Sequence, residues 1–181
     1  MRQVGLVVLF LAVGWLAYWG VGKLGERMKE TYSAPELSPR MFEKSTNYDL
    51  GRVQTFVSNN PKAANYYGFP LLFPLELFVM ILLGGAAAYA SVMSARTLGV
   101  PLDWIWLVLV LPVFYVAFDL VEDTLLALLL SDDRTHTESF IWFVKSITTV
   151  KLASVIAAGV QTLALLVAVP VRWLVRAAWG V

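Results

Sequence analysis

Four long apolar runs divide the chain, and shorter polar segments separate them. A membrane-spanning helix needs about 20 mostly apolar residues to cross the hydrocarbon core of a bilayer, and the runs have about that length or more. The pattern predicts an all-α membrane protein built as an antiparallel four-transmembrane-helix bundle. The predicted spans cover residues 4–21, 69–95, 104–130 and 140–169 within a single membrane domain, residues 1–181.

The first run ends in Trp15, Tyr18 and Trp19, amphipathic aromatics that favour the headgroup level. Arg2 gives this run a short positive start, so a cleaved signal peptide is a rival interpretation. The apolar part is long, however, and no small-x-small cleavage site follows it. These two features favour a retained transmembrane helix.

A polar segment, residues 22–68, follows the first run and carries charges of both signs. Ser38 followed by Pro39 resembles a helix start, because proline is well tolerated at the first helical position. Four apolar side chains then recur at helical spacing, at Leu50, Val53, Phe56 and Val57. We expect a long first extracytoplasmic loop whose short helices lie on the membrane or cap the bundle.

Small residues are concentrated in the second predicted span, where Gly84, Gly85 and Ala88 belong to a glycine- and alanine-rich stretch. Small residues let two membrane helices approach closely, so this stretch predicts a helix-packing surface. A hinge at the two glycines is the less favoured alternative. Pro70 and Pro74 stand near the start of the span, where prolines are tolerated.

Three acidic residues interrupt the third apolar run: Asp119, Glu122 and Asp123. Their i, i+3 and i+4 spacing places them on one face of a helix. An ionised carboxylate within a bilayer is costly unless it is paired, hydrated or neutralised, so the cluster marks a site or a structural lock. Pro112 precedes the cluster and frees a backbone carbonyl, because proline has no N–H to donate.

The fourth predicted span supplies a basic partner, Lys151, about three turns from its start. Asp119 lies about three turns from the end of the third span, so the two depths match in an antiparallel pair. We expect Lys151 to face Asp119 or Glu122 inside the bundle. Gln161 is a candidate for hydrogen bonding across helices. Glu76 is expected at the membrane interface, with a place in the acidic cluster as the alternative.

A short polar, acidic loop separates the third and fourth predicted spans. Lys145, near this end of the fourth span, is expected close to Asp132 or Asp133 or extended toward the headgroups. His136 lies in the same loop, and we expect it to be solvated.

Three interpretations of the buried charges compete. Under the preferred one, the acids and Lys151 form a hydrogen-bonded network that fixes helix register. Under the second, the excess of acids over one lysine leaves a carboxyl that is protonated or binds a cation, as in proton relays and cation sites. Under the third, two carboxylates act on a lipid as acid and base or through a divalent metal. The third has the least support, because the spans contain no histidine partner and no nucleophile with a base.

The composition narrows the choice further. Of 181 residues, 59% are hydrophobic and 15% charged, whereas about a quarter are charged in an ordinary soluble domain. A net charge of +1 gives no electrostatic support for a nucleic-acid partner. Cysteine is absent, which excludes disulfides, thiolate zinc sites and iron–sulfur clusters, and one histidine makes a multi-histidine site implausible. We therefore expect no catalytic residues, metal or cofactor.

Charge asymmetry predicts the orientation. The third loop is net acidic, whereas basic residues lie at the N-terminus, in the second connection and in the tail, at Arg2, Arg96, Arg172 and Arg176. The positive-inside rule then places both termini in the cytoplasm. Basic residues just after the first span oppose this assignment, at Lys23, Arg27 and Lys29. Trp173 and Trp179 complete a basic and aromatic anchor in the tail.

Three short motifs carry a resemblance. Residues 66–75 read YYGFPLLFPL, residues 119–123 read DLVED and residues 149–151 read TVK. The chain resembles a family of uncharacterised prokaryotic four-span integral membrane proteins with F-P, D-L-x-E-[ND] and T-x-K motifs. Asp123 stands where an amide is more typical, and Pro70 where an acid is expected. The resemblance implies the bundle and the acid–lysine face, and it implies no known activity.

Together these features predict a small polytopic protein of the prokaryotic cytoplasmic membrane, surrounded by lipid. We expect a structural or accessory subunit of a homo-oligomer or larger membrane complex, because the bundle is too thin to enclose a large cavity alone. The alternative is an oligomeric proton or cation pathway lined by Asp119, Glu122 and Asp123.

Overall fold

The computed structural model describes residues 2–34, 46–131 and 133–179. These residues are mostly helical and include no strand. The elements, in chain order, are α1 (Arg2–Tyr32), α3 (Leu50–Asn59), α4 (Pro61–Tyr66), a π-helical segment (Tyr67–Glu76), α5 (Leu77–Thr97), a 3₁₀ turn (Leu102–Trp104), α6 (Ile105–Ser131), a second 3₁₀ turn (Asp133–Thr135) and α7 (Glu138–Trp179). The helix start expected at Ser38 and Pro39 lies outside the described residues.

Three stretches of helix are long and apolar enough to cross a membrane: Pro61–Thr97, Leu102–Ser131 and Glu138–Trp179. Many of their large apolar side chains are exposed on the outside of the molecule, for example Trp106 and Leu163. Such a surface suits lipid rather than water. The structure is thus that of an all-helical protein consistent with a membrane location. The additional span expected at residues 4–21 is part of α1 and stays a prediction.

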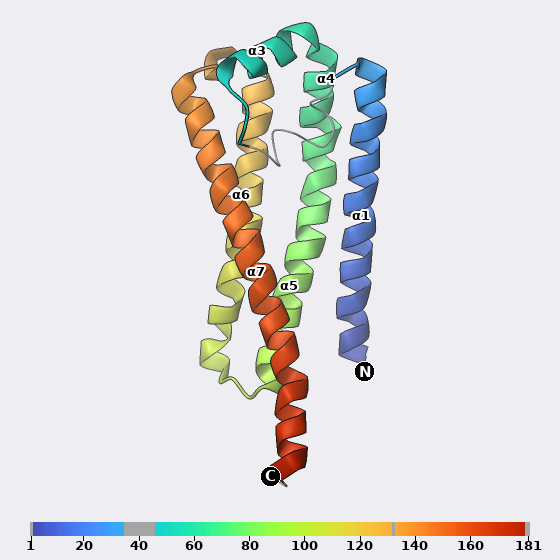
Figure 1. The fold of residues 1–181 in the computed structure, drawn as a ribbon, viewed down its shortest axis with the longest axis vertical. Helices are drawn as coiled ribbons and strands as arrows, with labels where there is room; N and C mark the ends of the chain where they lie inside the picture. Colours follow the sequence, from blue (N-terminus) through green and yellow to red (C-terminus); the bar gives the residue numbers. More distant parts are fainter. Residues whose placement is uncertain (1, 35–45, 132, 180–181) are drawn as a thin grey trace.

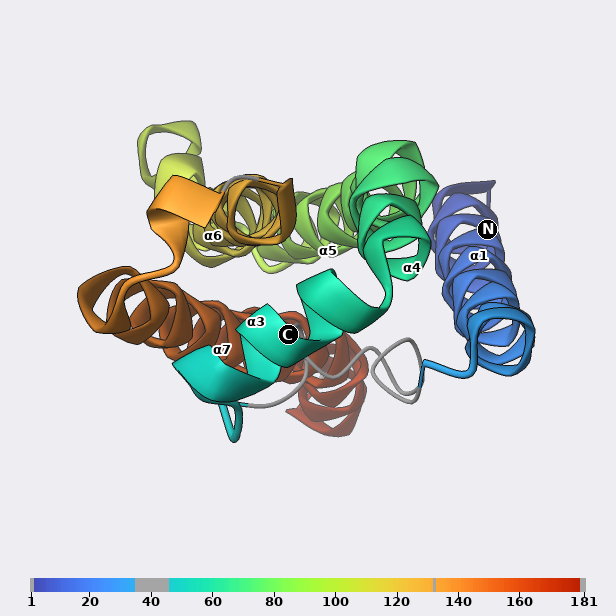
Figure 2. The same ribbon diagram turned by 90° about the horizontal axis from the view of Figure 1, so that it is seen from above.

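The four long helices lie side by side (Figure 1). α5 packs against α1, α6 and α7, and α6 packs against α7. Seen from above, α1 lies at one edge of the group beside α5 (Figure 2). Because the chain direction alternates from α1 to α5, α6 and α7, α1 begins and α7 ends at the same end of the molecule (Figure 1).

α3 and α4 form a cap over the opposite end of the long helices (Figure 1). Asp49 begins α3 as its N-cap, accepting a hydrogen bond of 2.8 Å from the Arg52 backbone N–H. Val53 and Phe56 point from α3 into the core, with exposed fractions of at most 2%. The apolar spacing of the sequence thus becomes the inner face of this short helix.

The helix that carries the second span begins earlier than residue 69 and is interrupted near its start. Phe69 and Phe73 have non-helical backbone angles. Each precedes a proline, Pro70 or Pro74, and the proline ring disfavours the α conformation of the residue before it. The chain therefore passes from α4 through the π segment into α5 along one bent path from Pro61.

Small residues shape two of the helix contacts, but not all of those expected to do so. A Cβ added at Gly84 would collide with the Val116 side chain of α6, and one added at Gly14 would lie 2.6 Å from Leu83 Cδ2. A Cβ at Gly85 would meet nothing within 4 Å. Gly84 thus allows the close approach of α5 and α6, whereas Gly85 faces away from that contact.

Candidate functional site

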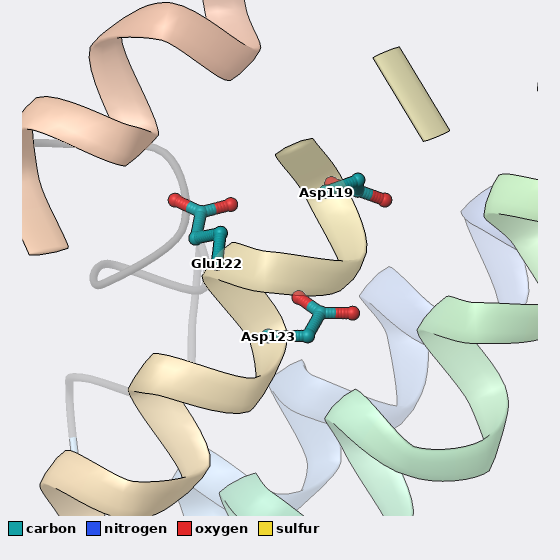
Figure 3. A group of neighbouring side chains, drawn as sticks. All are labelled: Asp119, Glu122 and Asp123. Carbon is teal, nitrogen blue, oxygen red and sulfur yellow. The ribbon is translucent and has the colours of Figure 1, made fainter. Parts of the chain in front are cut away.

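Asp119, Glu122 and Asp123 form a buried acidic face on α6. Their exposed fractions are 1%, 0% and 0%, and one carboxylate oxygen from each lies within 4.8 Å of the others. Figure 3 shows the three side chains on neighbouring turns of this helix. The i, i+3, i+4 spacing places them together, and the packing of α5 and α7 against α6 buries them.

Lys151 of α7 joins two of these acids. Its Nζ donates to Glu122 Oε2 at 2.5 Å and also forms an ion pair with Asp119. Lys151 is only 8% exposed, so the bridge lies inside the bundle. The structure therefore brings together α6 and α7 at the depth that the sequence indicated, and the lysine contacts both expected partners.

Thr148 is a second hydrogen-bond donor to the Glu122 carboxylate. Its hydroxyl donates to Glu122 Oε1, so both oxygens of this carboxylate have a partner on α7. Thr148 is fully buried, one turn before Lys151 on the same helix face. The i, i+3 relation to Lys151 is the sequence signal for this residue, which was not among the expected members of the network. Thr149 of the TVK motif is exposed and donates to the Lys145 carbonyl instead, at 2.9 Å.

Glu76 is a further buried acid, on a different element from α6. It is 7% exposed and is the last residue of the π segment, directly before α5. It stands well inside the helical stretch Pro61–Thr97. Its expected place at the membrane interface, with the acidic cluster as the alternative, stays a prediction.

Tyr48, from the segment before α3, faces Lys145 of α7. Its ring centroid lies 5.3 Å from Lys145 Nζ, and the side chain is 2% exposed. Burial, and then the Glu122 charge, raises the pKa of the Tyr48 phenol above its usual value, so the hydroxyl stays protonated. Lys145, expected close to Asp132 or Asp133 of the preceding acidic loop or extended toward the headgroups, faces this aromatic ring in a cation–π contact, which sequence spacing does not reveal.

A second polar contact joins α6 to α7 away from the charges. Gln161 Nε2 donates to the Val108 carbonyl at 2.7 Å. That carbonyl lies four residues before Pro112, which has no N–H to satisfy it. Gln161 therefore hydrogen-bonds across helices, and its acceptor is the carbonyl that the proline frees.

Two further polar residues connect elements outside the network. Ser91 of α5 and Thr162 of α7 lie 3.1 Å apart through their hydroxyls. His136, expected to be solvated, is half-buried, and its Nε2 donates to the Leu129 carbonyl at 2.9 Å. It therefore helps to close the end of α6, where helix carbonyls lack intrahelical donors.

The charged groups of the network are buried, and the Lys151 ammonium is paired with two carboxylates. Three carboxylates are a possible ligand set for a hard cation. Lys151 already contacts two of them, so a metal ion would have to displace its ammonium group. Thr148 and Lys151 each donate to one oxygen of the Glu122 carboxylate.

Comparisons with protein-family models, curated proteins and solved structures found no match to this chain. A functional proposal therefore depends on the geometry of the buried charges.

Proposed function

We propose that this protein is a small four-span membrane protein that acts as a structural or accessory subunit of a homo-oligomer or larger membrane assembly. The observation that carries the proposal is the Lys151 bridge to Asp119 and Glu122. In this proposal the bridge locks α6 against α7 in one register. Its role is to hold the bundle in the shape that its partners recognise.

The burial of the bridge supports a lock. Leaving one member of a buried ion pair without its partner is strongly destabilising, so sliding or rotation of either helix carries a large penalty. Thr148 adds a third contact to the same pair of helices. An isolated hydrophobic contact has no such directional requirement, which is why a polar network selects one register.

The fourth span in this proposal is α1. This helix runs for 31 residues and contains the apolar run of residues 4–21. It packs along α5, where Gly14 gives the Leu83 side chain room to approach. Trp15 and Trp19 are exposed on its surface, as expected for a helix that faces lipid near a headgroup layer.

The shared end of α1 and α7 supports an orientation with both termini in the cytoplasm. Arg96, Arg172 and Arg176 belong to the end of the molecule at which α1 begins and α7 ends (Figure 1). Under the positive-inside rule this end faces the cytoplasm of a prokaryotic cell. The cap of α3 and α4 then faces outward, where it is available to other subunits.

The proposed role as a subunit is tested by the native assembly. Protein purified in a mild detergent is expected to have a particle mass above that of one 20.1 kDa chain, as measured by light scattering corrected for bound detergent. In liposomes the wild type is expected to carry no proton or cation flux. A strictly monomeric particle isolated without partners would contradict the subunit proposal.

The second candidate is the oligomeric proton or cation pathway. The observation that favours it is the number of acids: Asp119, Glu122 and Asp123 are buried together on one face of α6, beside the ammonium group of Lys151. A buried surplus of negative charge is costly, so a proton or a cation on one carboxyl would lower the energy. Wild-type flux in liposomes that Glu122→Gln abolishes, in a variant that still folds, would favour this pathway over the lock.

A further inference from the structure

The C-terminal end of α5 closes in a Schellman turn. Gly99 donates to the Arg96 carbonyl at 2.9 Å, and Val100 donates to the Ala95 carbonyl at 3.0 Å. Gly99 has a φ angle of 77°, a conformation that glycine adopts without strain. The turn does not use the carbonyl of Thr97, the last residue of the helix, which therefore needs a donor from elsewhere.

Arg172 of α7 supplies that donor. Its Nη1 donates to the Thr97 carbonyl at 2.9 Å. A Cβ added at Gly99 would lie 3.3 Å from the same nitrogen, so the glycine also leaves space for the guanidinium group. The negative end of the α5 dipole favours a cation at this place. Arg172 is thus held at the level where α5 ends, although it belongs to α7.

A pocket of about 420 Å³ lies beside this contact. It is lined by Thr97, Arg172, Trp173, Arg176 and Ala177. Arg172 and Arg176 are one helical turn apart, and like charges at that spacing repel each other. None of the five lining residues is acidic, so two positive charges face one hollow without an anionic partner among them.

We propose that this pocket binds the phosphate of an anionic phospholipid headgroup. The contact with Thr97 uses one of the five N–H donors of the Arg172 guanidinium, and a second guanidinium at Arg176 can join it on one phosphate. The pocket lies where a membrane-length helix ends, which is the level of lipid phosphates. Trp173 is 69% exposed there, as an aromatic at a headgroup layer is expected to be.

Thermal unfolding of the full-length protein in neutral detergent tests the pocket. Phosphatidylglycerol is expected to raise the unfolding midpoint of the wild type, whereas phosphatidylcholine at the same concentration is not. Arg176→Gln is the first variant, because its side chain makes no hydrogen bond to any residue that the structure describes. Ala177→Leu is the second, because it fills the pocket and leaves the charge unchanged. In both, the apparent affinity for phosphatidylglycerol is expected to fall about tenfold or more.

Arg52→Gln serves as the matched control, because Arg52 is an exposed arginine on α3 at the other end of the molecule. It is expected to keep the wild-type response to lipid. Unchanged affinity for phosphatidylglycerol in Ala177→Leu would overturn the proposal, because the lipid would then bind a diffuse basic surface rather than the pocket. An equal rise of the unfolding midpoint with phosphatidylcholine would also overturn it. Inorganic phosphate is the last arm: a midpoint shift as large as that with lipid would assign the pocket to free phosphate instead.

Discussion

Gln161 of α7 satisfies the Val108 carbonyl of α6, the backbone acceptor that Pro112 leaves without a helical donor. Because Pro112 lacks an N–H, a carbonyl of α6 is left to accept a hydrogen bond from α7. In a bilayer an unsatisfied carbonyl has no water to bind, so this contact is needed even though it carries no charge.

The Gln161 contact predicts an energetic coupling between Gln161 and Pro112. Gln161→Leu is expected to lower the free energy of unfolding by about 1 kcal/mol, because it strands the Val108 carbonyl. In the Pro112→Ala variant, residue 112 again has an N–H that can bind the Val108 carbonyl. Gln161→Leu is therefore expected to lower the free energy of unfolding clearly less in this variant. Unfolding titrations in mixed detergent micelles measure all four proteins of this cycle. Equal costs in both backgrounds would show that the proline does not create the need for Gln161.

Thr148 and Thr149 offer a matched pair for the network. Thr148→Val removes a donor to Glu122 and is expected to destabilise the protein by about 1–3 kcal/mol, because the carboxylate oxygen stays buried. Thr149→Val makes the same chemical change on the exposed face of α7 and is expected to have little effect. The unfolding free energies of the two variants, measured under identical conditions, check this difference. Equal losses would contradict the described rotation of α7.

The charge of Lys151 is expected to matter more than its volume. Lys151→Met leaves Asp119 and Glu122 without their ammonium partner, a change that costs about 3–5 kcal/mol when a buried pair is broken. Combining it with Glu122→Gln removes one of the stranded charges and is expected to restore part of the loss. Folded yield and unfolding free energy of the single and double variants provide the measurement. A double variant that is no better than Lys151→Met would argue against the bridge as a lock.

Gly84 and Gly85 are expected to respond in opposite directions to the same substitution. Gly84→Ala pushes a methyl group into Val116 and is expected to cost about 1–3 kcal/mol, the usual range for overpacking. Gly85→Ala meets open space and improves helix propensity, so it is expected to be neutral or stabilising by up to about 1 kcal/mol. Unfolding titrations of both variants test the prediction, and a loss at Gly85 alone would place the α5–α6 contact on the wrong face.

The buried phenol of Tyr48 leads us to expect that the protein loses stability at alkaline pH. Its pKa is raised in the folded protein, so above about pH 10 the unfolded chain releases this proton while the folded chain still holds it. The Tyr48 contribution is therefore complete below that pH and is lost as pH rises further. Tyr48→Phe removes the titrating group, and its free energy of unfolding is expected to fall less between pH 9 and 11 than that of the wild type. Identical pH profiles would show that Tyr48 is not buried beside Glu122.

The residues that share one face of a helix, and their depth along it, were predictable because both depend on spacing along the chain. The acids at positions 119, 122 and 123 share a face in any α-helix. The depth of Lys151 follows from counting turns between two antiparallel spans. The start of the helix that carries the second span was not predictable in this way, because the helical stretch begins at Pro61 and is interrupted at Phe69 and Phe73.

By itself, the sequence determined the all-helical class, the apolar lengths that suit a membrane and the pairing of an acidic face with a lysine. These features depend on composition and on periodicity within one element. Only the tertiary structure decided that Thr148 rather than Thr149 contacts Glu122, that Gly84 rather than Gly85 contacts α6, and that Tyr48 lies over Lys145. Each of these choices depends on the rotation of one helix against another or on the path of a loop, and neither leaves a periodic signal in the chain.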